Sequence, residues 1–433
     1  MRRVAVIGSG IAGLAAARAL APHAAVTLLE AGPWFGGHAH TVDVTLDGVT
    51  HGVDTGFLVF NLRTYPRLIA LFKELDVATA PSEMSFSVQA PSRGLVWSGS
   101  GLDGVFAQRR NLLRPAFWGM LADILRFNRV CTGIARRNAD AELAEPLGRF
   151  LQRLRFGSLF QEGYLLPMIG SIWSCPTDQM LQFPVGTLIR FCHNHGLLQA
   201  TGQPPWRTVR GGSREYVRRM VLEVPDARLD TPVLRVQRLP PAEGHAGVLV
   251  TTRHGTERFD DVVMATHSDT SLSLLADATA PERAVLSAIR YHDNRAVLHT
   301  DASVLPATQR AWAAWNYERA PDAGTEQAAV CLHYLINRLQ PLPWQRPVVV
   351  SLNPVREVDP STVLGEWQYA HPVFDQAAIE AQRRLPTLQG SAGLWFCGAW
   401  TRYGFHEDGL MSGLAVAQDW LLRHRDAPVR VAA

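Results

Sequence analysis

The sequence is poor in cysteine, lysine and net charge, and it contains no long apolar run. Its five cysteines are scattered over 433 residues, and no two of them have CxxC spacing. This pattern excludes a disulfide framework as the basis of the fold, argues against a zinc site or any other bound metal, and favours a reducing compartment. A chain of this length can bury a full core without such cross-links.

The charges nearly balance, with 42 Lys and Arg against 39 Asp and Glu, so a nucleic-acid partner is not expected. No apolar run is long enough to cross a membrane, and the run Val4–Ile7 is too short for a signal peptide. With 47% hydrophobic and 19% charged residues, the chain should be globular. We predict a cytoplasmic protein that also acts at the inner face of the membrane.

The N-terminal segment, as far as Ala31, has the pattern of a βαβ unit. Val4–Ile7 is a short β-branched strand, Gly8–Gly13 reads GxGxxG, and Ala12–Leu20 is a helix rich in alanine and leucine. Val26–Leu29 is a second strand, and it ends at Glu30. A glycine motif between a strand and a helix, followed by an acid at the end of the next strand, predicts a dinucleotide-binding site.

Each conspicuous residue of this motif has a physical role. Gly8 permits the tight turn, Gly10 lets backbone amides approach a pyrophosphate, and Gly13 allows the helix to pack closely on the strand. The N-terminus of the helix offers amides and partial positive charge to the phosphates. Glu30 would accept hydrogen bonds from the ribose hydroxyls, and its charge disfavours a 2′-phosphate.

The rest of the chain divides into helical and alternating stretches. Helix is predicted near Tyr65–Leu75, through most of 105–195 and at Leu410–Leu422. Three strands are expected to return to the first sheet: Pro232–Arg238, Val248–Thr252 and Phe259–Thr266. A second, antiparallel sheet is predicted from Trp312–Tyr317, Val330–Leu335 and Val348–Leu352, and a last strand from Leu394–Cys397.

Further segments resemble flavoproteins of the amine oxidase and phytoene desaturase superfamily, and the resemblance runs from residue 4 to about residue 420. They are Gly36-Gly37-His38, Val53–Phe57, Arg210–Ser213, Thr231–Val233, Phe259–Thr266, Leu394–Thr401 and Gly404–Gly413. This chain has His38 where the family usually has an arginine, and Ala399 where it usually has an acid.

The resemblance implies an α/β fold in which a Rossmann-like FAD-binding domain of the GR2 type is interleaved with an α+β substrate domain. The substrate domain would combine a mixed or antiparallel sheet with helices. The expected FAD-binding domain comprises residues 1–75, 205–280 and 385–433, and the expected substrate domain comprises 76–204 and 281–384.

FAD is therefore the predicted cofactor. The residues expected to bind it are Gly8, Gly10, Ile11, Ala12, Gly13, Glu30, Ala31, Gly36, Gly37, His38, Thr55, Gly56, Phe57, Val233, Ala265, Gly398, Ala399, His406, Asp408 and Leu410.

The segments VDTGFLVFN, FCHNHGLL and FCGAWTRYGFHEDGL resemble a narrower bacterial subgroup that is associated with cyclopropane-fatty-acid synthases. This resemblance implies a lipid acyl chain as substrate and such a synthase as partner. The segment Phe117–Phe127 is rich in bulky apolar residues and has basic residues in or beside it at Arg114, Arg126 and Arg129, so it would either lie on a membrane surface or pack within the substrate domain.

The choice of chemistry depends on few residues. The lone lysine, Lys73, lies in an amphipathic helix and should be solvated, which makes a lysine-assisted amine oxidation unfavoured. His406 and Glu407, at the predicted edge of the flavin, are the candidate catalytic residues. The residues expected to line a hydrophobic substrate channel are Trp173, Tyr334, Asn337, Trp400, Tyr403 and Phe405.

We predict an FAD-dependent oxidoreductase in which hydride passes between flavin N5 and a carbon of an apolar substrate, such as a fatty-acyl chain. Desaturation, saturation and double-bond isomerisation all remain open. Two alternatives are a flavin amine oxidase and a non-catalytic, FAD-bound partner of a lipid-modifying synthase.

Overall fold

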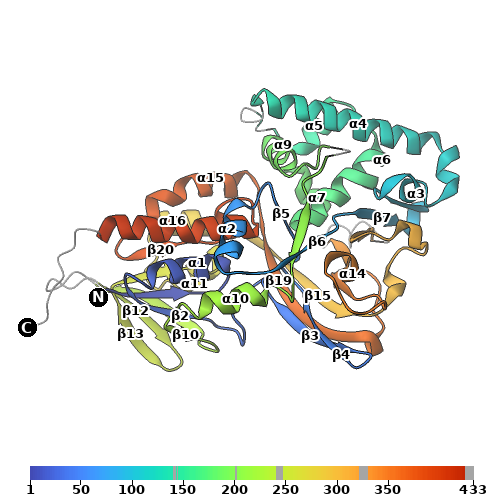
Figure 1. Ribbon diagram of the computed structural model, residues 1–433. Coiled ribbons are helices and arrows are strands. Elements are labelled where there is room, and N and C mark those ends of the chain that lie inside the picture. Colours follow the sequence, from blue (N-terminus) through green and yellow to red (C-terminus); the bar gives the residue numbers. More distant parts are fainter. Residues whose placement is uncertain (140–142, 144, 200–201, 240–246, 321–329, 425–433) are drawn as a thin grey trace, which may run out of the picture.

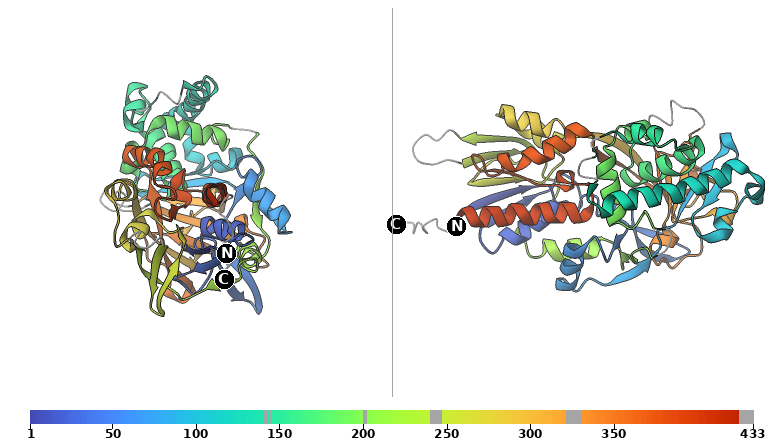
Figure 2. Two further views of the ribbon diagram at one scale, coloured as in Figure 1. Left: turned by 90° about the vertical axis from the view of Figure 1, so that its left-hand side faces the viewer. Right: turned by 90° about the horizontal axis from the view of Figure 1, so that it is seen from above.

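A computed structural model describes residues 1–433 apart from 140–142, 144, 200–201, 240–246, 321–329 and 425–433, and apart from the side chains of 177 and 178. Elements from both ends of the chain lie together at one end of the molecule, and the helices of residues 101–194 lie at the other (Figure 1 and Figure 2). Helix α1 (Ile11–Leu20) packs against α16 (His406–His424). The contact is close, because a Cβ atom at Gly413 would collide with the carbonyl oxygen of Ala12.

The first sheet is parallel throughout and has five strands. Their order is β10 (Asp226–Arg228), β2 (Ala25–Leu29), β1 (Arg3–Ile7), β14 (Asp261–Met264) and β20 (Leu394–Phe396). Val4 and Val6 of β1 face the cluster that contains α1 and α16, whereas Ala5 and Ile7 face a second cluster on the other side. The sheet is thus buried on both faces, as its continuous apolar strands predict.

Two of the three strands predicted to return to this sheet lie elsewhere. The strands β11 (Val233–Leu239), β12 (Gly247–Thr252) and β13 (Gly255–Phe259) form an antiparallel sheet of their own, and only β14 joins the parallel sheet. The burial of the strands explains the difference: β14 is buried at all four residues, whereas β11 exposes several of its residues, which is typical of a strand covered on one face.

The second large sheet has seven strands, and its predicted members pair as expected. The order is β19 (Val363–Val373), β15 (Arg290–His299), β18 (Val349–Leu352), β17 (Cys331–Leu335), β16 (Trp315–Glu318), β7 (Phe86–Ala90) and β8 (Leu95–Ser98). The pairs β16–β17 and β17–β18 are antiparallel, which confirms the prediction, and β7 pairs with β16 in parallel.

The predicted helical stretch forms a layer beside the seven-stranded sheet (Figure 1). It contains α3 (Gly101–Val105), α4 (Pro115–Arg136), α5 (Leu147–Arg153), α6 (Ser158–Phe160), the π-helical Gln161–Leu165, α7 (Leu166–Trp173), α8 (Thr177–Leu181) and α9 (Val185–Asn194). Fully buried aromatic side chains, among them Phe127, Phe150 and Phe160, fill its interior. No helix in the described part of the chain is both long and apolar enough to cross a membrane.

Smaller elements connect these layers. The strands β3 (Thr41–Leu46) and β4 (Val49–Asp54) form a hairpin, and β5 (Phe60–Asn61), β9 (Trp206–Val209) and β6 (Thr79–Ser82) form a small sheet. The described residues also form the α-helices α2 (Pro66–Glu74), α10 (Arg214–Val221), α11 (Ser268–Leu274), α12 (Ala280–Leu286), α14 (Ile336–Leu339) and α15 (Gln376–Arg384). Short 3₁₀ turns cover Pro91–Arg93, Arg109–Leu113, Ala302–Val304, Gln309–Ala311, Pro360–Thr362, Leu385–Leu388 and Ala399–Thr401.

Candidate active site

A cavity of about 520 Å³ begins at the carboxyl end of β1 and extends to the seven-stranded sheet and to helices α7 and α9. Its first part is lined by the turn after β1, the loop at residues 36–38, and segments that follow β14 and β20. Its second part is lined by side chains of the substrate-side elements. The cavity therefore joins the predicted cofactor site to the predicted substrate site.

The turn after β1 has the geometry that its glycines predict. Gly8 has a φ of +100°, which favours glycine, and a Cβ atom there would lie 2.8 Å from the carbonyl oxygen of Ala265. A Cβ atom at Gly13 would collide with the carbonyl oxygen of Gly8, so α1 packs directly on the turn. A Cβ atom at Gly10 would instead meet nothing within 4 Å. Open space before the N-terminus of α1 is suited to a phosphate group.

Glu30 lies at the end of β2 with its carboxylate fixed by neighbouring donors. One oxygen accepts hydrogen bonds from the backbone amide of Ser9 at 2.9 Å and from its hydroxyl at 2.5 Å. The other oxygen accepts the amide of Gly32 at 2.9 Å. These bonds hold a negative charge at the wall of the cavity, where it can receive ribose hydroxyls and repel a 2′-phosphate. The contact with the hydroxyl of Ser9 was not predicted from the motif.

Three half-buried histidines, His38, His267 and His371, lie together on the cavity wall. The ring of His38 lies 5.3 Å from that of His371 and 6.2 Å from that of His267, and its Nε2 atom has no hydrogen-bond partner among the described residues. Burial lowers the pKa of all three imidazoles, that of His38 well below its usual value and that of His371 to about 4. We call this group the histidine wall, and it is uncharged at neutral pH.

The sequence predicted only His38 of this wall. His267 directly follows the strand motif around β14, and His371 comes from β19, a strand that was not predicted. The Nδ1 atom of His371 accepts a hydrogen bond from the side-chain amide of Asn294 at 2.9 Å, which leaves the ring proton on Nε2. The wall thus presents imidazole groups that can still form hydrogen bonds to a ligand.

His406 is the first residue of α16, and it also lines the cavity. Its ring stacks on Phe57 with centroids 3.8 Å apart, and its Nε2 atom lies 2.5 Å from the hydroxyl of Tyr216. Burial lowers the pKa of His406 to about 3, so the ring is neutral at physiological pH. Its contact with Tyr216 was not predicted, because α10 lies far from α16 in the sequence. A catalytic role for His406 stays a prediction.

Glu407 and Asp408 point away from this cavity. The carboxylate oxygens of Glu407 accept the backbone amides of Arg67 at 2.8 Å and Leu68 at 2.9 Å, which are among the first amides of α2. A carboxylate oxygen of Asp408 accepts the amide of Phe405 at 3.1 Å, and burial raises the pKa of Asp408 to about 6. Glu407 therefore stabilises the start of α2, and its predicted catalytic role has no further support from its position.

Most of the predicted cofactor residues line the cavity together. Those in its wall are Gly8, Gly10, Ile11, Ala12, Glu30, Gly36, Gly37, His38, Gly56, Phe57, Ala265, Gly398, Ala399 and His406. Those outside the described lining are Gly13, Ala31, Thr55, Val233, Asp408 and Leu410. Among the latter, Gly13 lies behind the turn, and the hydroxyl of Thr55 lies 2.7 Å from that of Tyr369.

Five of the six predicted substrate residues, Trp173, Tyr334, Trp400, Tyr403 and Phe405, line the cavity. Asn337 does not, and its prediction needs correction. Its side-chain nitrogen donates to the carbonyl oxygens of Trp344 and Arg346, each at 3.0 Å, and its oxygen accepts the amide of Val348 at 2.7 Å. All three hydrogen bonds join Asn337 to the backbone of residues 344–348, so its side chain holds this segment in place.

The substrate end is more apolar than the sequence alone predicted. Additional lining residues there are Met84, Ile172, Phe191, Leu197, Trp206 and Trp315. The rings of Trp173 and Phe191 lie 4.6 Å apart, and those of Phe191 and Phe405 lie 4.9 Å apart. Glu30 is the only carboxylate in the described lining, which contains neither lysine nor arginine. Lys73 is exposed on α2, as predicted.

A second hollow, of about 570 Å³, shares Tyr65, His195, Tyr403 and Phe405 with the first. Its wall is polar, with Arg63, Arg402, Glu407 and Asp408 among its residues. The two hollows therefore adjoin at an aromatic boundary.

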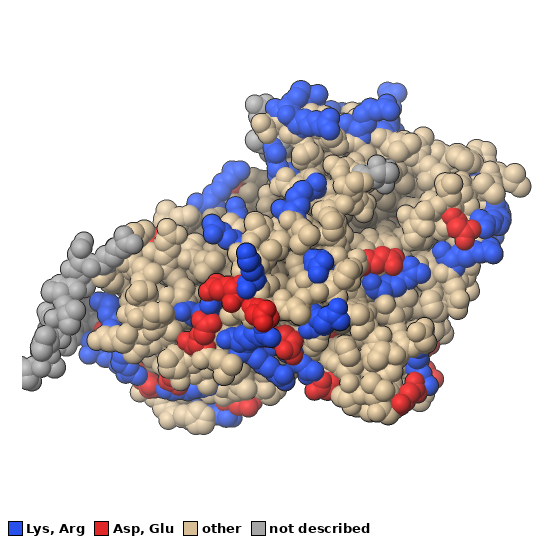
Figure 3. All heavy atoms as spheres, viewed as in Figure 1, with Lys and Arg blue, Asp and Glu red and all other residues tan. Residues whose placement is uncertain are grey.

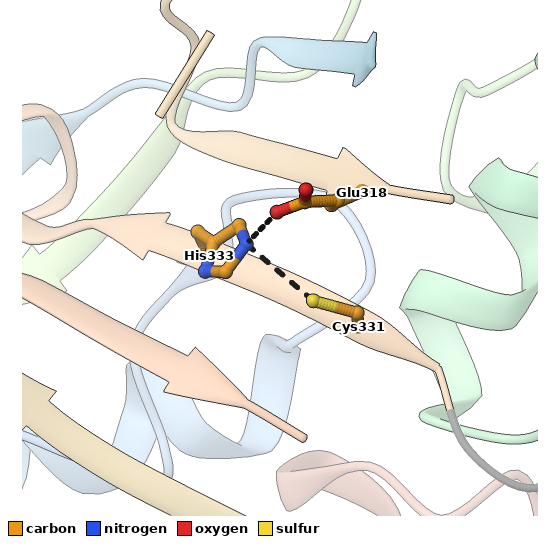
Figure 4. A group of neighbouring side chains, drawn as sticks. All are labelled: Glu318, Cys331 and His333. Carbon is orange, nitrogen blue, oxygen red and sulfur yellow. Dashed lines mark hydrogen bonds and ion pairs between the residues drawn. The ribbon is translucent and has the colours of Figure 1, made fainter. Parts of the chain in front are cut away.

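A different buried polar cluster lies within the seven-stranded sheet (Figure 4). The Nε2 atom of His333 is 3.0 Å from a carboxylate oxygen of Glu318 and 3.4 Å from the sulfur of Cys331. The Nδ1 atom of His333 is 2.7 Å from the hydroxyl of Ser351, and Arg356 pairs with Glu318 at 2.8 Å. Cys, His and Glu are also metal ligands, but a guanidinium bonded to the same carboxylate opposes a second cation.

Comparison with known proteins identifies relatives for most of the chain. The family model described as flavin containing amine oxidoreductase matches residues 11–299. A carotenoid phi-ring synthase from Streptomyces griseus is 29% identical over 299 residues, which cover 63% of this chain and 54% of that protein. The chain thus spans about half the length of this curated relative.

Solved structures resemble the chain over nearly its whole length. A CLA-producing fatty acid isomerase from P. acnes has a TM-score of 0.66 at 14% identity, covering 98% of each chain. A putrescine oxidase bound to putrescine (0.65, 15% identity) covers 98% of this chain and 99% of its own. A cyclohexylamine oxidase from Brevibacterium oxydans (0.65, 14%) covers 97% and 99%. At these identities the likeness concerns the fold, and it confirms the predicted fold class.

Proposed function

The chain belongs to the flavin-containing amine oxidoreductase family, and on this premise we propose that it is an FAD-dependent oxidoreductase whose substrate is an apolar chain of the fatty-acyl type. The family membership accounts for the flavin and for the redox chemistry. The class of substrate is inferred from the lining of the cavity.

The residues of the cofactor end fit FAD. Gly10 faces open space at the N-terminus of α1, where a pyrophosphate would meet backbone amides. Glu30 holds a fixed carboxylate at the end of β2, where a ribose is expected, and its charge excludes NADP-like 2′-phosphates. His38 has a buried, unpartnered ring nitrogen on the same wall, which is a hydrogen-bonding atom still without a partner among the described residues.

Bound FAD supplies the two-electron redox chemistry that side chains lack, and the protein supplies position and a dry environment. The aromatic side chains of Trp173, Phe191 and Phe405 exclude water from the substrate end. His406 is neutral and lies 2.5 Å from the hydroxyl of Tyr216, so this pair can hold a proton at the edge of the cavity without carrying charge. We infer that desaturation, saturation or isomerisation of a double bond occurs in this apolar chamber.

The observation that carries the proposal is the apolar lining of the substrate end, where the described residues place no carboxylate and no lysine or arginine. An apolar chain can be buried there without leaving a charge unpaired. The names of two similar proteins, a carotenoid phi-ring synthase and a fatty acid isomerase, point to the same substrate class. A cyclopropane-fatty-acid-synthase-like partner is a separate proposal that rests on the subgroup resemblance alone.

The experiment uses the purified, flavin-loaded protein under anaerobic conditions. Unsaturated and saturated fatty acids and a bacterial lipid extract are added in one series, and putrescine and cyclohexylamine in the other. Visible flavin absorbance is followed, and the acyl products are analysed by mass spectrometry, because a redox-neutral isomerisation leaves no net bleaching.

Loss of absorbance or a changed double bond in the lipid series alone supports the proposal. Bleaching by amines alone replaces it with an amine oxidase. Inertness toward both series, together with stoichiometric capture of a lipid-modifying synthase, replaces it with a non-catalytic role.

A further inference from the structure

Exposed apolar side chains gather on the segment that contains α3 and the first half of α4. Leu113 is 88% exposed, Leu102 79%, Leu125 59%, Trp118 49% and Leu112 46%. We call these five residues the apolar face. Trp118 and Leu125 are seven residues apart in α4, which is about two helical turns, so they lie on the same side of the helix.

The apolar face is additional to the side of α4 that packs inward. Phe117, Met120 and Phe127 are buried on that inner side. These residues already pack α4 onto the protein, so the exposed apolar side chains are not needed for its packing. Soluble proteins rarely leave a group of large apolar side chains uncovered unless it meets a partner or a membrane.

Basic residues are concentrated in the segment that carries the apolar face. The sequence from 101 to 155 contains ten arginines and five carboxylates, a net charge of +5. The whole chain carries +3, so the rest of it sums to −2. Figure 3 shows basic side chains along the upper edge of the molecule, where Figure 1 places α4 and α5. The cationic character of the protein is therefore concentrated in the helical layer.

Several of these arginines are available to an external anion, and two of them lie beside the apolar residues of α4. Arg114 and Arg129 are exposed at the start and in the second half of α4, and neither forms an ion pair with any residue that the structure describes. Arg126 differs, since it pairs with Asp123 at 2.9 Å and lies over the ring of Phe156. In the sequence, Arg114 and Arg129 flank Trp118 and Leu125.

We propose that the apolar face, with Arg114 and Arg129, docks the protein on the surface of an anionic lipid bilayer. Leucine and tryptophan side chains would enter the boundary between headgroups and acyl chains, and the arginines would contact the anionic headgroups. A lipid surface fits because its partner groups are fluid, so scattered leucines need no complementary pockets. The charge of the segment selects an anionic surface over a neutral one.

The position of α4 links this surface to the cavity. Its inner side packs on α9, and Phe191 of α9 lies in the cavity wall. Docking would therefore bring a bilayer to within one helix layer of the substrate end. The proposal does not depend on the proposed reaction, because lipid binding can be measured without turnover.

The test is sedimentation of the flavin-loaded protein with vesicles of phosphatidylcholine, either alone or mixed with phosphatidylglycerol. Binding is expected to the mixed vesicles, to weaken as salt is added, and to be at least about tenfold weaker with phosphatidylcholine alone. The double variant Leu113→Glu/Trp118→Glu should lose most of the binding. The variant Arg114→Gln/Arg129→Gln should retain part of the binding and depend less steeply on salt than the unchanged protein does.

The matched control is Leu222→Glu/Leu422→Glu, which changes two leucines that are 85% and 53% exposed on other elements. It should bind as the unchanged protein does, and every variant is checked for its flavin spectrum and melting temperature. Failure of the unchanged protein to bind mixed vesicles overturns the proposal, as does equal binding by the Leu113/Trp118 variant. In either case an acidic protein partner becomes the better occupant of this face.

Discussion

The protein contains two groups of histidines whose charge states are opposite, a half-buried group on the cavity wall and a buried one in the seven-stranded sheet. In the histidine wall, burial is the leading influence and lowers the pKa of His38 and His371. In the cluster within the seven-stranded sheet, burial also acts to lower the pKa of His333, but Cys331 and Glu318 outweigh it and raise this pKa to about 9. One group is neutral and faces open space, and the other is charged and enclosed.

The difference shows what determines the charge of a buried imidazole. Burial alone lowers the pKa of an imidazole, whereas the nearby Cys331 and Glu318 together raise that of His333 above its usual value. The neutral group still has a nitrogen without a partner among the described residues, Nε2 of His38, which is expected of a wall that receives a ligand. In the charged group, His333 has partners at both ring nitrogens, which is expected of a structural element.

The largest expected effect follows from filling the cavity that the neutral histidine wall lines, at the position of Gly10. In Gly10→Val the new side chain would occupy the space where the pyrophosphate is expected, and the φ of −58° at Gly10 suits a branched residue. We expect a folded protein with essentially no bound flavin, measured by absorbance of the purified protein. Gly119→Ala on α4, where a Cβ also meets nothing within 4 Å, should keep its flavin. Retention of flavin by Gly10→Val would contradict the assignment of the phosphate site.

The next largest effect is expected from removing the carboxylate of Glu318, which balances the charge of the enclosed His333. Glu318→Gln leaves His333 and Arg356 without their carboxylate, and breaking a buried pair in this way costs about 3–5 kcal/mol. Urea unfolding should record this loss of stability, while the flavin spectrum stays unchanged. Glu366→Gln removes an ion pair whose side chains are roughly half exposed, so it should cost no more than about 1 kcal/mol. Equal losses of unfolding free energy in the two variants would contradict the expected difference between an enclosed and a half-exposed ion pair.

The pH dependence of stability should separate the two groups by sign. The folded pKa of His333 is above the unfolded value near 6.5, so its contribution is complete below about pH 6.5 and is lost as pH rises through 9, a change of roughly 3 kcal/mol. The folded pKa of His371 is about 4, so protonation of the unfolded chain destabilises the protein as pH falls from 6.5 toward 4.

Unfolding free energies measured across this range should therefore fall on both sides. His333→Gln should flatten the alkaline side, and His371→Gln should flatten the acid side. A profile that keeps its alkaline slope after His333→Gln would assign that slope to another group.

The smallest effect is expected from His38→Arg, which restores the residue that related flavoproteins usually have. A buried guanidinium beside two neutral imidazoles should lower the melting temperature of the flavin-free protein by a few degrees, since unpaired buried charge is costly. Bound FAD should recover the loss through its phosphates. Melting curves with and without added FAD measure both effects, and a flavin-dependent rise no larger than that of the unchanged protein would refute the contact.

The sequence predicted most reliably the strands that are buried on both faces of a sheet. After Arg3 and Asp261 at their first positions, β1 and β14 are apolar, and β14 joins the first sheet as predicted. The apolar segment of β20 was predicted as a strand, although its pairing with β14 was not. It misplaced β11 and β12, since alternation reveals a half-buried strand without naming its partner. It missed β15 and β19, whose polar residues, such as Asn294 and His371, pair with one another inside the structure.

The site was predictable where one short segment carries it and unpredictable where distant segments meet. Gly8, Gly10 and Glu30 follow from the single βαβ motif at the start of the chain. Tyr216 and His406 are 190 positions apart in the sequence, and no pattern near either residue predicts their contact. Glu407 and Asn337 were assigned to the site by their neighbours in the sequence, whereas their hydrogen-bond partners are backbone groups that only the fold brings near.

The packing of α16 against α1 has a consequence for how the protein binds flavin. Gly398, Ala399 and His406 complete one side of the cavity, and they belong to the last tenth of the chain. The glycine turn after β1 forms the opposite side of the same cavity, so residues almost 400 positions apart must come together before a ligand can be enclosed. Flavin binding should therefore depend on the docking of α16 on α1, and a substitution at Gly413 that separates these helices should weaken it.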